Sequence, residues 1–148
     1  MQKTVLVFGT FDGLHKGHRD FFRQALRQAQ GKLKNSAYLV VVVGRDSTVE
    51  KTKKRLPKFG EQERLKAIED SGLVSEARLG NEAGPDGKLD PYKIIEEIKP
   101  DIICLGYDQT RFTDKLATEL PKLGLGHVKI HRLEAFQPEK YKSSIFNK

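Results

Sequence analysis

The sequence predicts one α/β domain of the Rossmann-like type, with a doubly wound parallel sheet of five strands. Short apolar runs that are rich in branched residues and bounded by turn formers are typical of buried parallel strands. Segments with helical apolar periodicity separate these runs, and such alternation favours right-handed crossovers. At 148 residues the chain can bury one sizeable core, so we expect a single domain over residues 1–148.

The first half of the chain supplies three strands and two helices. In order, the predicted elements are a strand over 5–8, a helix over 19–29, a strand over 38–43, a helix over 61–70 and a weaker strand over 77–79. Each helix carries apolar residues at helical spacing, and these are Phe22, Ala25, Leu26 and Ala29 in the first helix and Leu65 and Ile68 in the second. Gly31 offers a stop for the first helix.

The second half continues the alternation. Its predicted elements are a helix over 91–98, a strand over 102–105, a helix over 114–123 and a strand over 128–130. The apolar stripes are Ile94, Ile95 and Ile98 in the first of these helices and Leu116, Leu120 and Leu123 in the second. Cys104 is the only cysteine, so no disulfide can form within the chain, and we assign it a buried apolar role without catalysis.

Composition narrows the classes of function. Lysine and arginine total 27 against 20 acidic residues, and the net charge of +7 suits a polyanionic partner. We do not expect nucleic acid, because the chain lacks tryptophan, basic repeats interleaved with aromatic residues and zinc-ligand spacing. A nucleoside triphosphate and a phosphorylated small molecule fit the charge better. No apolar run approaches the roughly 20 residues of a membrane span, so we expect a soluble, cytoplasmic protein without membrane contact.

The most informative segment is Gly9-Thr10-Phe11-Asp12-Gly13-Leu14-His15-Lys16-Gly17-His18, between the first strand and the first helix. Its glycines let the backbone approach a ligand, and its two imidazoles lie three residues apart on one face of the first helical turn. Unpaired N–H groups at a helix start favour an anion, and histidines can donate hydrogen bonds to phosphate oxygens. The segment indicates a nucleotide phosphate site; a helix-capping pair of histidines is the structural alternative.

This segment also matches the signature G-T-F-D-x-x-H-x-G-H, and the chain resembles the cytidylyltransferase-like nucleotidyltransferases. The likeness covers most of residues 3–144 and is greatest to the archaeal FAD synthase branch. It continues at Gly44-Arg45-Asp46, at Lys51 and Lys53, at Glu61-Gln62-Glu63-Arg64 and at Leu105-Gly106-Tyr107-Asp108-Gln109. The resemblance implies the strand order 3-2-1-4-5. Residues 10–12 and 106–109 would then meet at the carboxyl edge of the sheet, where such folds bind ligands.

The family's reaction is attack by an acceptor phosphate on the α-phosphorus of a triphosphate, with release of pyrophosphate. The resemblance implies four catalytic residues. His18 and His15 would donate hydrogen bonds to the α- and β-phosphate oxygens, and Lys51 and Lys53 would clamp the α-phosphate and the acceptor's phosphate. The two lysines belong to a run rich in cations over 51–58, for which a solvated basic loop is the alternative.

Two sets of binding residues follow from the same resemblance. The nucleotide-binding set is Gly9, Thr10, Phe11, His15, His18, Asp108, Arg132, Ser143 and Ser144. The acceptor-binding set is Asp12, Lys53 and Arg64. A structural role in the turn is the alternative for Asp12, and a surface ion pair with Glu61 is the alternative for Arg64. We expect no metal ligands from the protein, because Mg²⁺ commonly arrives bridging triphosphate oxygens.

The C-terminal residues depart from the family pattern. Only Ile145-Phe146-Asn147-Lys148 follows the serine pair, so the family's final helix is expected to be short or absent. We expect residues 134–148 to form a tail that is mobile or orders only on nucleotide binding. The contacts expected from Ser143 and Ser144 depend on that ordering.

The expected function is that of a Mg²⁺-dependent nucleotidyltransferase. FMN adenylyltransferase (FAD synthase) activity is preferred, because Gly106-Tyr107-Asp108-Gln109 and the spacing from Asp46 to Arg64 look most like that branch. CTP:glycerol-3-phosphate cytidylyltransferase activity and a non-catalytic nucleotide-binding module stay open as alternatives. The sequence does not decide between ATP and CTP or fix the acceptor. It leaves a homodimer open, since relatives often pair through the face near the active site.

Overall fold

The computed structural model describes residues 3–11, 13–14, 16–29, 37–46, 58–80, 91–106 and 115–133. Within these ranges it has the predicted architecture, a five-stranded parallel sheet in the order β3-β2-β1-β4-β5. The strands are β1 (Lys3–Gly9), β2 (Ala37–Val43), β3 (Glu76–Leu79), β4 (Ile102–Leu105) and β5 (Lys129–Arg132). The helices are α1 (Lys16–Ala29), α3 (Glu61–Asp70), α4 (Pro91–Ile98) and α5 (Leu116–Lys122).

The predicted bounds are confirmed for α3, α4 and β4, and the bounds of the other elements differ from the prediction at one or both ends. The differences at α1 and β5 have a physical reason. Helix α1 begins at Lys16, before the position 19 that the pattern predicted. Its first turn is polar and therefore gives no apolar period. Strand β5 extends to Arg132, past the predicted end at 130, and all four of its residues are exposed. An exposed edge strand lacks the apolar run that marks a buried one.

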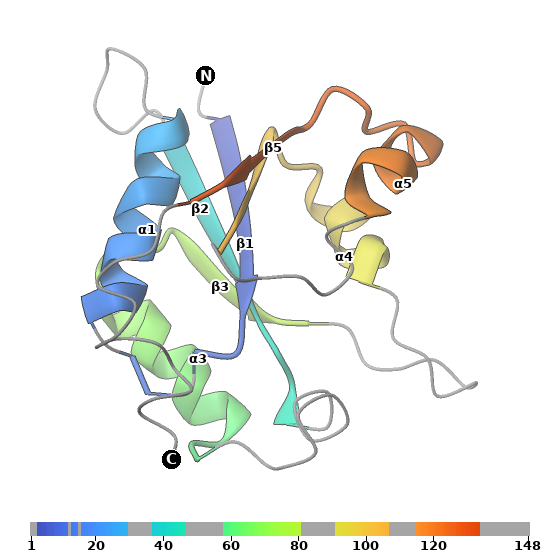
Figure 1. The fold of residues 1–148 in the computed structure, drawn as a ribbon. Helices are drawn as coiled ribbons and strands as arrows, with labels where there is room; N and C mark the ends of the chain where they lie inside the picture. The colour runs from blue at the N-terminus through green and yellow to red at the C-terminus, as the bar shows by residue number, and fades with distance from the viewer. Residues whose placement is uncertain are drawn as a thin grey trace.

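Two layers of helices enclose the sheet (Figure 1). Helices α1 and α3 lie on one face, and α4 and α5 lie on the other. Side chains of β1 alternate between the two faces, as the period of a strand requires. Val5 and Val7 belong to a core cluster with Phe22 and Ile68, while Leu6 belongs to a separate cluster with residues of α4 and α5. The doubly wound architecture therefore creates two cores, one on each face.

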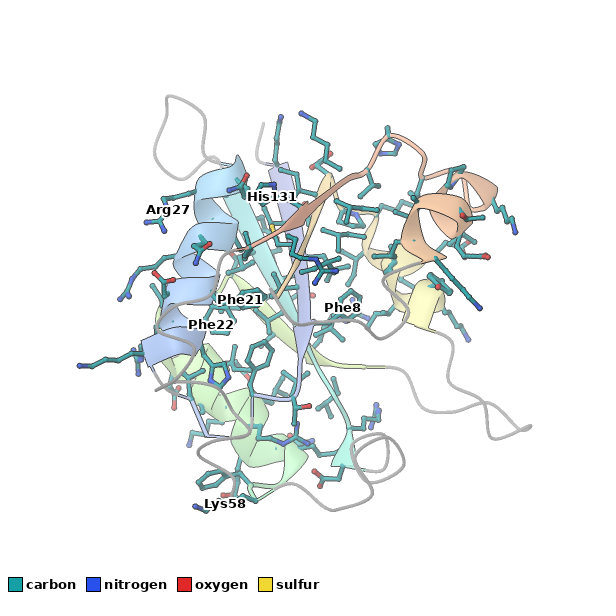
Figure 2. The ribbon with its side chains drawn as sticks, viewed as in Figure 1. Phe8, Phe21, Phe22, Arg27, Lys58 and His131 are labelled. Carbon is teal, nitrogen blue, oxygen red and sulfur yellow. The ribbon has the colours of Figure 1, made fainter. Side chains whose placement is uncertain are left out.

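The apolar stripes predicted for the helices face these cores. Phe22 and Ala25 of α1, Ile68 of α3 and Ile95 of α4 have no exposed surface. Figure 2 shows Phe21 and Phe22 pointing from α1 toward the sheet, whereas Arg27 points away from it. Burial at the predicted stripe positions anchors each helix on the sheet and fixes where its first turn lies.

Candidate functional site

The candidate site lies at the carboxyl edge of the sheet, beside β1. Strand β1 pairs with β2 along its whole length and with β4 through Val5↔Ile102 and Leu6↔Ile103. The connections wind outward from β1 in opposite directions, so the carboxyl ends of β1 and β4 form the topological switch point of the fold. The expected adjacency of the first and fourth strands is confirmed. Thr10 and Gly106 follow these two strands at this edge.

Phe11 turns back into the protein directly after β1. Its φ of 54° lies in the left-handed region, which is uncommon for a residue with a bulky side chain. The side chain is buried, and its ring centroid lies 5.3 Å from that of Phe22. The nucleotide contact predicted for Phe11 stays a prediction, and it would have to come from the backbone because the ring belongs to the core.

The Phe11 ring also explains the glycine at position 9. A Cβ atom built on Gly9 would lie 2.6 Å from Cζ of Phe11 and 2.7 Å from Cε2. Carbon atoms do not approach so closely, so any larger residue at position 9 would displace the ring. From the sequence, the glycines of this segment are interpreted as space for a ligand. The structure shows that the space at Gly9 is taken by the ring of Phe11. Gly13, with a φ of 89°, supplies the left-handed turn that leads into α1.

His18 lies in the first turn of α1 and packs against the same ring. Its centroid is 5.3 Å from that of Phe11, and the two planes meet at 77°. This edge-to-face arrangement is a favoured geometry for aromatic pairs. The imidazole is half-buried, so Phe11 holds one side of it near the helix start, where backbone N–H groups lack helical partners. Its phosphate contact stays a prediction, and His15 lies outside the described residues.

Arg64, predicted to bind the acceptor, is buried at the base of this edge. The residue is 1 % exposed, and its Nη2 donates to Oδ1 of Asp46 at 2.8 Å. The alternative of a surface ion pair with Glu61 is therefore wrong, because Glu61 pairs instead with Arg45 at 3.6 Å. The predicted acceptor contact of Arg64 stays a prediction, and most of its donors already have protein partners.

Helical periodicity contains a signal for this burial. Position 64 lies four residues before Ile68, on the same stripe of α3, so the residue points inward with the apolar side chains. A charged residue on the apolar stripe of a helix is ordinarily expected at the edge of that stripe, with its charge in solvent. Here the carbonyl groups and the carboxylate that surround the guanidinium make burial favourable.

A polar network joins α3 to the ends of β2 and β3. The backbone N–H of Asp46 donates to Oε1 of Glu61 at 2.8 Å, and Nε of Arg45 donates to the carbonyl of Gly80 at 2.6 Å. Gly44-Arg45-Asp46, quoted above for the resemblance, thus has a structural role. It connects the carboxyl ends of the strands to the start of α3.

Arg132 lies on the β4 side of the edge. It pairs in register with Leu105, and its Nη1 donates to the carbonyl of Gly106 at 2.7 Å. This contact holds the guanidinium at the carboxyl end of β4, across the switch point from Thr10. The location suits the nucleotide-binding role predicted for Arg132, which stays a prediction.

The remaining predicted site residues lie outside the described part of the chain. They are Asp12, His15, Lys51, Lys53, Asp108, Ser143 and Ser144. The expected C-terminal tail over 134–148 and the side of the predicted pocket formed by 107–109 lie outside it as well. Among the described residues, the structure brings Gly9, Thr10, Phe11 and His18 together and places Arg64 beneath them. Arg132 lies on β5, which is separated from β1 by β4.

Two further properties concern metal sites and membranes. Within the described ranges, no group of three or more histidine, cysteine, aspartate or glutamate residues could hold a metal ion. No helix in that part of the chain is long and apolar enough to cross a bilayer.

The fold and the edge define a Rossmann-like α/β protein whose ligand site lies at the switch point. A family model described as cytidylyltransferase-like matches residues 6–148. The FAD synthase of Methanobrevibacter smithii is 44% identical over 142 residues, which cover 96% of this chain and 86% of that protein. The FAD synthase of Methanothermobacter thermautotrophicus is 42% identical over 135 residues, which cover 91% and 82%.

A solved structure agrees with this assignment. The lipopolysaccharide core biosynthesis protein from Thermoplasma volcanium is 36% identical and superposes with a TM-score of 0.77 over 93% of this chain and 100% of that one. The chain belongs to the cytidylyltransferase-like family. It is accordingly an enzyme of the nucleotidyltransferase class.

Proposed function

We propose that the protein is an FMN adenylyltransferase, which transfers the adenylyl group of ATP to the phosphate of FMN and so makes FAD and pyrophosphate. Two FAD synthases are more than 40% identical to it over most of their length. The structural observation that carries the proposal is the position of His18, in the first turn of α1 at the switch-point edge, with its ring packed against Phe11.

The reaction exchanges one phosphoanhydride bond for another. An oxygen of the FMN phosphate attacks the α-phosphorus of ATP and forms a new P–O bond. The bond from that phosphorus to the oxygen that bridges to the β-phosphorus breaks, and pyrophosphate leaves with the electron pair. Little covalent chemistry is required of the protein, so catalysis comes from positioning and from stabilising negative charge.

His18 is the described residue best placed for that stabilisation. We propose that it donates a hydrogen bond to a phosphate oxygen as charge develops, at the end of α1 where the helix dipole favours an anion. The edge-to-face contact with Phe11 holds the ring before the substrate arrives, which reduces the reorganisation needed in the transition state. Lys51 and Lys53 are proposed to clamp the α-phosphate and the acceptor's phosphate, and His15 is proposed to share with His18 the donation of hydrogen bonds to the α- and β-phosphate oxygens.

The triphosphate is proposed to enter as its Mg²⁺ complex. Mg²⁺ usually keeps several waters and is bound through substrate phosphates with few protein ligands. In this proposal the ion is part of the substrate and neutralises charge on the leaving pyrophosphate.

The proposed partners are ATP and FMN. We propose no interaction with nucleic acid or with a membrane. Nucleotide binding is assigned to Gly9, Thr10, Arg132 and the residues around Asp108, on both sides of the switch point. Acceptor binding is assigned to Asp12 and Lys53. We propose the cytoplasm as the compartment and a homodimer as the assembly, which sedimentation equilibrium of the purified protein tests directly.

The decisive experiment pairs each triphosphate with each acceptor. The purified protein is incubated with Mg²⁺, with ATP or CTP, and with FMN, riboflavin or glycerol 3-phosphate, while pyrophosphate release is followed and products are separated by chromatography. We expect pyrophosphate and FAD in equal amounts from ATP with FMN alone. Riboflavin lacks the attacking phosphate and serves as the matched negative control. Turnover with CTP and glycerol 3-phosphate would replace this proposal with the cytidylyltransferase activity, and no turnover in any mixture would favour a non-catalytic module.

A further inference from the structure

We infer that Arg64 is a positioning residue for His18 and acts on it through Thr10 and Phe11. The inference rests on the proposed role of His18 in nucleotidyl transfer. It assigns to Arg64 a function in addition to the acceptor contact that the family likeness implied.

The guanidinium of Arg64 connects α3 to three other stretches of the chain, at Thr10, at residues 44–46 and at Phe59. Its Nη1 donates to the carbonyl oxygens of Thr10 and Gly44, each at 2.8 Å. Its Nε donates to the carbonyl of Phe59 at 3.0 Å, and its Nη2 donates to Asp46 at 2.8 Å. Four of the five N–H groups of a guanidinium are thus engaged, and the planar fork leaves little freedom to the groups that it binds.

The contact with Thr10 is the one that reaches the site. The carbonyl of Thr10 and the N–H of Phe11 belong to one rigid peptide plane. Nη1 of Arg64 binds this carbonyl and the carbonyl of Gly44 together. Arg64 therefore fixes the orientation of the peptide plane that precedes Phe11, whose backbone is left-handed. The Phe11 ring in turn lies against the imidazole of His18. A shift of the Thr10 carbonyl would therefore move the ring that orients the histidine.

Lysine could not make the same set of contacts. An ammonium group is one nitrogen at the end of a flexible chain, whereas these acceptors are bound by three different nitrogens in a plane. Asp46 balances the charge, and its side chain is 37% exposed while that of Arg64 is 0% exposed. The carboxylate of Asp46 is thus partly exposed to solvent, and its Oδ1 holds Nη2 of the buried guanidinium.

The test compares Arg64→Lys with Ile68→Val. Ile68 lies one turn later on α3 and is fully buried, so its truncation disturbs the same helix without touching Thr10. The first readout is the NMR signal of the His18 imidazole in the free protein, assigned by its loss in His18→Ala. The second is kcat and KM with Mg·ATP and FMN, measured well below the melting temperature of each variant.

In Arg64→Lys we expect the His18 ring signals to move and kcat to fall about 10-fold or more, since small misplacements at a reacting centre are costly, with KM for ATP changed less. Ile68→Val should leave the ring signals and kcat close to those of the unmodified protein. The inference is overturned if the two variants behave alike in both readouts. If Arg64→Lys does not fold, Asp46→Asn removes the charged partner of Nη2 and should move the same signals to a smaller extent, and unmoved signals overturn the inference.

The two readouts separate this inference from the proposed function. The NMR comparison needs no substrate, so it decides whether Arg64 orients His18 even in a protein that does not make FAD. A protein that lacks activity with ATP and FMN refutes the proposed function. His18 ring signals that are the same in Arg64→Lys and in the unmodified protein refute the positioning role.

Discussion

The two faces of the sheet bury different kinds of side chain. The face covered by α4 and α5 buries aliphatic side chains, and its buried members are Leu6, Val40, Val42, Ile94, Ile95, Ile103, Leu105, Leu116, Leu120, Leu125 and Val128. The face covered by α1 and α3 also buries the aromatic rings of Phe11 and Phe22 and the thiol of Cys104. Arg64, in α3, is the only buried charged side chain within the described ranges.

This difference separates stability from function. An aliphatic core needs no polar partners, whereas a buried charge is favourable only when its hydrogen bonds are satisfied. The polar and aromatic groups of the α1/α3 face gather where β1 ends, next to His18. We therefore expect substitutions at this edge to change catalysis and substitutions on the α4/α5 face to change stability alone.

The largest expected effect is that of His18→Ala. Removal of one donor to a developing negative charge lowers kcat by about 100-fold to 1,000-fold in other enzymes, and we expect a loss of that size here. The melting temperature should change little, because the imidazole is half-buried and its aromatic contact contributes only about 0.5–1.5 kcal/mol. Steady-state pyrophosphate release and thermal unfolding measure the two quantities. His127→Ala, at an exposed turn, is the control, and a fully active His18→Ala protein would remove His18 from the mechanism.

Gly9→Ala should give the next largest effect at the same edge. The new methyl group would lie within 2.6 Å of the Phe11 ring, which must then move away from its place beside His18. Overpacking of this kind costs about 1–3 kcal/mol of stability, and we expect kcat to fall as well. Urea unfolding and steady-state kinetics measure both.

Gly126→Ala is the matched substitution away from the edge. Its methyl group would meet Pro121 at 3.6 Å, an ordinary contact distance. We expect unchanged kcat and a free energy of unfolding equal to or slightly above that of the parent protein, since alanine restricts the unfolded chain. Equal behaviour of the two glycine variants would show that the Phe11 ring is not held as the structure describes.

The elements of both faces could be predicted from the sequence, because apolar periodicity is a local property. Ile94, Ile95 and Ile98 mark α4 by their helical spacing alone, and the bounds of that helix are as predicted. The strand order came from the family likeness. The apolar pattern does not specify which strands are neighbours.

The contacts of the site could not be predicted in the same way. Arg64 binds carbonyl groups of Thr10, Gly44 and Phe59, which lie far apart in the chain and carry no side-chain signature of that contact. The reason for Gly9 was also hidden, since it depends on the conformation of Phe11. Sequence motifs thus indicate where the candidate site lies, whereas the interactions that hold its described residues depend on the folded backbone.

Ile95→Val on the α4/α5 face should give a smaller effect, on stability alone. Ile95 is fully buried in the aliphatic core, and removal of one methylene costs about 0.5–1.5 kcal/mol. We expect urea unfolding to show a loss in that range, with kcat and KM unchanged at temperatures where the protein is folded. A fall in kcat comparable with that of Gly9→Ala would contradict the division between the two faces.

The smallest expected effect concerns Cys104, which belongs to the α1/α3 face but lies in its apolar interior. Burial raises the pKa of the thiol from 9.0 to about 12. The native thiol should therefore stay protonated at pH 8 and react slowly with a thiol reagent, while the urea-unfolded protein reacts quickly. The unfolded chain loses this proton first, so the contribution of Cys104 to the free energy of unfolding falls as the pH rises from about 9 toward about 12.

Cys104→Ala tests whether chemistry on this face is confined to the carboxyl edge. It should abolish labelling in urea, weaken the decline of stability above pH 9 and leave kcat unchanged. Rapid labelling of the native protein at pH 8 would show that the thiol is accessible and ionised, contrary to its burial in the core. A loss of kcat in Cys104→Ala would extend the functional region from the edge into the interior of the α1/α3 face.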